Sequence, residues 1–133
     1  MSVFVDTSAL LAVLHGSDAH HARAARIWTT LLERDTDFVS TNYVLVETSA
    51  LLQSRFGLDA VRDLVDTITP LLRVAFVTED VHAAALAALF AARRRQLSLV
   101  DCVSFATMRR LSVTRAFAFD PHFAQQGFEL VQH

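Results

Sequence analysis

Hydrophobic residues follow two different periods along the chain, and the change between them predicts its elements. Short β-branched and aromatic runs are typical of buried strands, and they occupy residues 3–5, 38–39, 73–77, 115–119 and 128–131. Apolar residues at helical spacing begin after residue 7 and recur over residues 19–34, 43–56, 58–69, 81–95 and 102–111. Strands that alternate with helices predict a parallel sheet between helical layers. We expect one α/β domain over residues 1–133, a three-layer α/β/α sandwich around a mostly parallel sheet of four to five strands.

The first of these strands ends on an acidic residue. Residues 3–5 lead directly to Asp6, and Thr7 or Ser8 is expected to cap the following helix. In an open parallel sheet, the carboxyl ends of the strands face helix N-termini, and this edge is where such sheets bind ligands. Taken alone, Asp6 is explained equally well as an N-cap or turn residue.

Other acids stand at comparable places. Helical spacing puts Glu47 on the apolar side of the helix over residues 43–56, where a carboxylate is costly unless it pairs with Arg or binds metal. Asp101 falls in the first turn of a later helix among apolar neighbours, and Asp120 follows the fourth strand. Because strand ends and helix starts share one edge, we expect Asp6 to meet all of these acids there.

Such a convergence of carboxylates requires cations. Two carboxylates about 4 Å apart repel each other by roughly 4 kcal/mol at an effective dielectric constant near 20. All-oxygen ligation and high negative charge suit Mg²⁺ or Mn²⁺. These ions polarise a phosphoryl oxygen and generate hydroxide from bound water.

Composition narrows the possible functions. All 12 basic residues are Arg, so the absence of Lys excludes a Schiff-base lysine, a P-loop lysine and the lysine of phospho-receiver domains. The formal net charge of −2 gives no global basic field for nucleic acid. One Cys allows no intrachain disulfide, and neither a secretion signal nor a membrane-length apolar run is present, so we expect a cytoplasmic protein without a membrane contact. The high apolar share, 53%, favours a partner-covered surface.

Three histidines, His15, His20 and His21, gather at the turn between the first two helices. Two of them are adjacent and no Cys accompanies them. We therefore expect solvated turn histidines, with a zinc site as the alternative.

The four acids also lie in segments that resemble a known family. Val-Phe-Val-Asp-Thr-Ser-Ala-Leu, Thr-Asn-Tyr-Val-Leu-Val-Glu, Leu-Ser-Leu-Val-Asp and Ala-Phe-Ala-Phe-Asp-Pro-His-Phe are similar, in order and spacing, to the acidic motifs of PIN-domain nucleases. The bare single domain is most like the VapC-type toxins of bacterial toxin–antitoxin pairs. The resemblance implies that Asp6, Glu47, Asp101 and Asp120 bind Mg²⁺ (or Mn²⁺) and are catalytic, and that Ser8 supports the cluster by hydrogen bonds.

The same resemblance implies an activity and partners. Enzymes of this kind are metal-dependent endoribonucleases that hydrolyse RNA by in-line attack of activated water, leaving a 3′-hydroxyl and a 5′-phosphate. They are usually homodimers and are silenced by a cognate VapB-type antitoxin. Six basic residues, for which a solvated surface position is the alternative, become candidates for RNA phosphate contacts; they are Arg93, Arg94, Arg95, Arg109, Arg110 and Arg115.

Three alternatives remain open at this point. A haloacid-dehalogenase-like phosphotransferase requires a second Asp two residues after the first, where this chain has Ser8. A stand-alone RNA-processing PIN nuclease has the same acids as a toxin. A non-catalytic PIN-like interaction module would pair its acids with Arg instead of metal.

Overall fold

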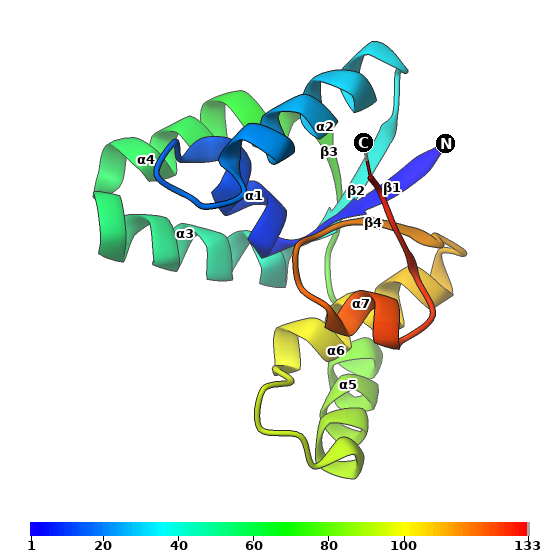
Figure 1. The fold of residues 1–133 in the computed structure, drawn as a ribbon. Coiled ribbons are helices and arrows are strands. Elements are labelled where there is room, and N and C mark those ends of the chain that lie inside the picture. The colour runs from blue at the N-terminus through cyan, green and yellow to red at the C-terminus, as the bar shows by residue number, and fades with distance from the viewer. Residues whose placement is uncertain (133) are drawn as a thin grey trace.

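The computed structural model describes residues 1–132 and contains a sheet in which every neighbouring pair of strands is parallel. The strands are β1 (Ser2–Val5), β2 (Asp37–Thr41), β3 (Leu72–Ala75), β4 (Arg115–Phe117) and β5 (Glu129–Leu130). They are arranged in the order β3-β2-β1-β4-β5, which puts β1 in the centre (Figure 1). The expected α/β class is confirmed, with five strands at the upper end of the expected range.

Helices cover both faces of this sheet (Figure 1). On one face lie α1 (Thr7–Leu14), α2 (His21–Glu33), α3 (Asn42–Phe56) and α4 (Leu58–Asp63), which continues into a π-helical turn (Leu64–Ile68) and a 3₁₀ turn (Thr69–Leu71). On the other lie α5 (Glu79–Ala92), α6 (Leu99–Arg110) and α7 (His122–Gln125). The faces differ because the chain moves outward from β1 to β3 and then crosses back past β1 to β4, and right-handed crossovers reverse their face with direction.

The central strand explains why the fold begins with an almost wholly apolar run. Val3, Phe4 and Val5 have no exposed surface, because helices pack on both sides of β1 and other strands flank it. The largest buried side chains include Phe117 on β4 and Phe123 on α7. Burying a Phe side chain contributes about 2–3 kcal/mol from apolar surface alone, so the strand that carries Asp6 is held firmly.

The turn at the end of β1 differs from the expectation in one respect. Asp6 itself, rather than Thr7 or Ser8, is the N-cap of α1, and its side chain accepts a hydrogen bond from the Ser8 N–H. The reason is geometric: an Asp in extended backbone directly before a helix points a carboxylate oxygen at the free N–H groups of the first turn. Thr41, Thr78 and Ser98 cap α3, α5 and α6 in the same way.

The run Arg93-Arg94-Arg95 also lies differently from the expectation, which placed it inside a helix ending at residue 95. The helix α5 ends at Ala92, and Arg93 adopts the left-handed conformation with φ 51°. This conformation is typical of a chain leaving a helix. The arginine run therefore belongs to the loop that leads into α6 and not to the last helical turn.

The strand order creates a switch point between β1 and β4. From the end of β1 the chain turns to the helices of one face, whereas from the end of β4 it turns to α7 on the other face (Figure 1). Asp6 directly follows β1, and Asp120 lies a few residues after β4. Ligands of open parallel sheets bind at such a point.

Within the described residues, no helix is long and apolar enough to cross a membrane.

Gly57 joins α3 to α4 with φ 89° and ψ −175°, a conformation that is essentially restricted to glycine. We predict that Gly57→Ala lowers the free energy of unfolding by about 1–3 kcal/mol, although a Cβ there would meet no neighbouring atom. Gly16→Ala is the matched control, because Gly16 also has open space around it but lacks a positive φ. Urea unfolding of both variants tests this, and equal stabilities would contradict it.

Candidate metal centre at the carboxyl edge of the sheet

Ser8 ties Asp6 to the segment that follows β4. The Asp6 Oδ2 atom accepts hydrogen bonds from the Ser8 hydroxyl at 2.7 Å and from the Ser8 N–H at 3.2 Å. The Ser8 Oγ atom in turn accepts a hydrogen bond from the Phe119 N–H at 2.9 Å. The Asp6 N–H also donates to the Phe117 carbonyl at 3.1 Å. The two strand ends on either side of the switch point are therefore joined through one serine.

Burial and neighbouring charges make Asp6 hard to ionise. Desolvation raises its pKa from the ordinary value of 3.8 to about 6 and outweighs the Ser8 hydrogen bonds, which favour the charged form. The charges of Asp101 and Asp120 raise the pKa further. The structure thus brings these three of the four predicted acids close enough for mutual repulsion.

Asp101 is fixed by the start of α6. Its Oδ2 atom accepts a hydrogen bond from the Ser98 N–H at 3.1 Å, while its own N–H donates to the Ser98 hydroxyl at 3.0 Å, which is a complete capping box. Burial is the main cause that raises the Asp101 pKa, and the charge of Asp120 adds to it. A capping residue would normally be solvated, but here the α6 N-terminus points the carboxylate into the protein.

Asp120 is fixed by a histidine that the sequence analysis did not select. Its Oδ1 atom accepts a hydrogen bond from the His122 N–H at 2.9 Å and lies 2.7 Å from His122 Nδ1. An ionised carboxylate only accepts hydrogen bonds, so this contact is a hydrogen bond in the tautomer that carries its proton on Nδ1. Asp101, Asp120 and His122 offer ligand atoms within 4.8 Å of one another. The sequence signal was the Asp-Pro-His turn, in which the histidine follows the acid by two residues.

The three acids share one feature that favours a cation. Asp6, Asp101 and Asp120 each use one carboxylate oxygen to accept hydrogen bonds from nearby protein groups. Within residues 1–132, no hydrogen bond reaches the second oxygen of any of them. The acids are therefore oriented by the protein while their remaining oxygens stay available, which is how metal-binding carboxylates are held.

Glu47 stands at the rim of this group. It is half-buried on α3 and lines a hollow of about 300 Å³ together with Tyr43, Val46 and Val100, the residue before Asp101. The expected alternative, a buried Glu–Arg pair, is absent from the ion pairs found in residues 1–132. The contact between α3 and α6 places Glu47 beside the α6 N-terminus but outside the tightest cluster.

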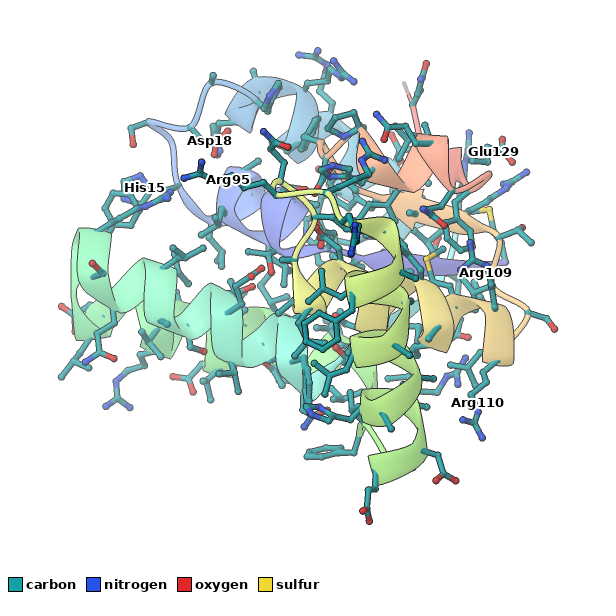
Figure 2. All side chains as sticks on the ribbon, turned by 90° about the horizontal axis from the view of Figure 1, so that it is seen from below. His15, Asp18, Arg95, Arg109, Arg110 and Glu129 are labelled. Atoms are coloured by element: carbon teal, nitrogen blue, oxygen red, sulfur yellow. The ribbon has the colours of Figure 1, made fainter. Side chains whose placement is uncertain are left out.

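The candidate phosphate-binding arginines fall into two groups. Arg115 begins β4, and Arg109 and Arg110 end α6, so these arginines lie at the opposite ends of their elements from Asp120 and Asp101. Figure 2 shows Arg109 and Arg110 on the side of the molecule away from Arg95. Arg115 pairs with Glu129 at 3.2 Å.

The remaining arginines, residues 93–95, lie in the loop between α5 and α6. The Arg94 guanidinium donates to Gln125 Oε1 at 2.9 Å, and Arg109 donates to the adjacent Gln126 Oε1 at 2.9 Å. Arg94 and Arg109 therefore bind neighbouring glutamines at the end of α7.

The sequence and the fold together identify the family. A family model described as the PIN domain matches residues 3–129. The chain belongs to the PIN-domain family. This PIN domain has a central parallel sheet, and Asp6 follows its central strand.

Individual relatives agree with this assignment. The 23S rRNA-specific endonuclease VapC20 from two strains of Mycobacterium tuberculosis is 36% identical over 127 residues, which are 95% of this chain and 95% of the relative. The crystal structure of M. tuberculosis VapC20, described as a sarcin-ricin loop cleaving toxin, matches with a TM-score of 0.87 over 98% of this chain and 99% of that chain. FitAcB from Neisseria gonorrhoeae, 15% identical with a TM-score of 0.69 over 99% and 97% of the two chains, shares the fold.

The raised pKa of Asp6 predicts a pH-dependent stability of the metal-free protein. Because the folded state holds this proton more tightly than the unfolded state, the contribution of Asp6 is fully present below about pH 4 and is lost as the pH rises through about 6. Asp6→Asn keeps the shape and removes the ionisation. We expect this variant in chelator to be more stable than wild type by up to about 3 kcal/mol above pH 7, and near wild type below about pH 4.

Urea unfolding of both proteins across this pH range measures the difference. Asp35→Asn, which alters an exposed carboxylate, is the control and should give a flat difference. A wild type as stable as Asp6→Asn at neutral pH would show that burial of Asp6 carries no cost.

Proposed function

We propose that this PIN domain is a divalent-metal-dependent endoribonuclease and the toxin of a toxin–antitoxin pair. The observation that carries the proposal is the set of three oriented carboxylates at the switch point, each with one oxygen free of hydrogen bonds. The extended similarity to an rRNA endonuclease, 36% identity over 95% of the chain, supports RNA as the substrate class. Cleavage would leave a 3′-hydroxyl and a 5′-phosphate.

The donor set fits a divalent cation. Asp6, Asp101 and Asp120 repel one another in a buried site, and a bound cation would remove that repulsion. We assign these acids to Mg²⁺ or Mn²⁺, with Glu47 at the rim as the fourth predicted ligand. When bound, such an ion polarises a phosphoryl oxygen and lowers the pKa of coordinated water.

The protein's own groups orient this machinery. Ser8 holds the Asp6 carboxylate, Ser98 holds that of Asp101, and His122 donates to Asp120. Each donor fixes one oxygen and thereby the direction of the other, so that little reorganisation is needed when substrate enters. The Ser8–Asp6 hydrogen bond supports the role that the resemblance implies for Ser8.

The structure disfavours the non-catalytic alternative. An interaction module that merely neutralised its acids would pair them with arginine. In residues 1–132, none of the ion pairs joins an Arg to Asp6, Glu47, Asp101 or Asp120. Among these residues, the one basic side chain in an ion-pair contact with any of the acids is His122, whose Nδ1 lies 2.7 Å from Asp120 Oδ1 and which is charged only when protonated.

Partners follow from the toxin assignment. We propose a cognate VapB-type antitoxin, a homodimer and action in the cytoplasm, where ribosomal RNA is found. Ala84 and Ala88 on α5 are exposed and leave apolar surface for a partner, and the exposed Phe90 lies on the same helix. Leu52 on α3 is fully buried and is therefore no part of such an interface.

Cleavage of RNA by the purified protein tests the activity. We expect wild type to cleave ribosomal RNA with Mg²⁺ or Mn²⁺ and to lose cleavage in excess chelator, because the carboxylates need the cation. Asp6→Asn and Asp101→Asn should each reduce the rate by at least about 100-fold, whereas Asp35→Asn should not change it. Cleavage that survives thorough chelation would contradict the metal-dependent mechanism.

Expression in a bacterial host tests the biological role. Induction of the wild-type chain alone should arrest growth, whereas Asp101→Ala at matched expression should permit growth because the site has lost a predicted ligand. Immunoblots establish equal expression. If both strains grow equally well while the purified wild type cleaves RNA, the chain is a processing nuclease and not a toxin.

A further inference from the structure

Phe119 occupies a special position beside the acids. It directly precedes Asp120, and its N–H donates to the Ser8 hydroxyl that also binds Asp6. The backbone of Phe119 is therefore held next to Asp6, because both residues bind the same serine hydroxyl. The side chain is half-buried, so part of the ring lies at the surface next to the site.

Two exposed residues from the start of α2 gather on this ring. The His20 imidazole stacks on Phe119 with ring centroids 4.4 Å apart and an interplanar angle of 5°. The Arg23 guanidinium carbon lies 5.3 Å from the centroid of the same ring. We refer to these residues as the His20–Phe119–Arg23 cluster. His20 is an exposed turn residue, as expected, and its ring in addition stacks on Phe119.

The turn before α2 holds this cluster in place. The Asp18 Oδ1 atom accepts a hydrogen bond from the His20 N–H at 2.8 Å, and His21 Nδ1 lies 2.7 Å from the Ala12 carbonyl oxygen. In residues 1–132, the ion pairs include neither His20 nor Arg23. The imidazole face and the guanidinium are consequently fixed in position but have no carboxylate partner.

Such a cluster has the chemistry of a single-stranded RNA contact. Flat aromatic groups at the surface stack on unpaired bases, and arginine binds phosphate. The acids repel a phosphodiester as it approaches. The Arg23 guanidinium, which lies on the ring of the residue before Asp120, offsets that repulsion. We propose that the His20–Phe119–Arg23 cluster is a substrate-binding subsite, on which an unpaired base stacks against His20 while Arg23 contacts a phosphate beside the scissile bond. This inference rests on the proposed endoribonuclease function.

A purely structural role, in which His20 only shields Phe119 from water, is the competing explanation. The same turn provides a matched control, because His15 stacks on Phe56 with ring centroids 3.3 Å apart and an angle of 12°. That second pair lies at the C-terminal end of α3, and Figure 2 shows His15 at that end of the helix. His15→Ala therefore removes a comparable His–Phe stack that is remote from the acids.

The probe is a fluorescent RNA hairpin that carries the sarcin-ricin loop sequence. Its Kd is measured by anisotropy in chelator, and its KM and kcat are measured with Mg²⁺. We expect His20→Ala to raise Kd and KM by about 10-fold while kcat changes by less than about 2-fold. His20→Phe should retain wild-type affinity, because it keeps an aromatic face. His15→Ala should match wild type.

Arg23→Ala supplies an independent readout. Loss of one phosphate contact should weaken binding and lower the slope of log Kd against log salt by about 0.7–1. This variant also keeps the proposal testable if His20→Ala fails to fold, since circular dichroism identifies misfolded variants. An unchanged Kd and salt slope for Arg23→Ala, equal losses in His15→Ala and His20→Ala, or no rescue by His20→Phe would each overturn the subsite.

The experiment separates the subsite from the underlying function. Wild type that cleaves the hairpin, with His20→Ala unaltered, overturns the subsite alone. Wild type that binds with the predicted dependence on His20 and Arg23 but does not cleave supports the subsite and overturns the nuclease assignment. Wild type that neither binds nor cleaves any RNA overturns both.

Discussion

The hydrogen bonds of the Ser8 hydroxyl connect the acid at the end of β1 to the segment after β4. It donates to Asp6 at the end of β1 and accepts from the Phe119 N–H after β4. These strands are neighbours in the sheet, but their chains leave toward opposite faces. Without a link, the two segments would be free to move apart where the sheet hydrogen bonds end. Ser8 therefore sets the distance between two acids that repel each other, and it also positions the ring of Phe119.

That arrangement has a cost in stability. Burial raises the pKa of Asp6 to about 6, so at neutral pH the fold must hold a charge that water would solvate better. The burial of Val3, Phe4 and Val5 on β1 compensates for this cost. The most deeply buried strand therefore directly precedes the least favourable charge. A bound cation would remove the electrostatic cost that remains in the metal-free protein.

The same edge combines contributions from distant parts of the chain. Capping geometry at α1 and α6 orients Asp6 and Asp101, whereas a turn after β4 orients Asp120 through His122. Each acid is fixed by a residue two or three positions away in sequence. The local turns thus prepare each carboxylate, and only the sheet brings them together. The His20–Phe119–Arg23 cluster is likewise assembled from distant parts of the chain, since His20 and Arg23 at the start of α2 contact Phe119 after β4.

The sequence by itself determined the α/β class, the strands and all helices except the short α7 within a few residues, and the acids at strand and helix ends, because hydrophobic period and capping chemistry are local properties. The family resemblance extended this to the chemistry of the site. Tertiary structure decided what local patterns do not encode. The packing of α3 against α6 left Glu47 at the rim. The fold also brought His20 against Phe119, the residue before Asp120, because this contact depends on how the turn before α2 packs against the segment after β4.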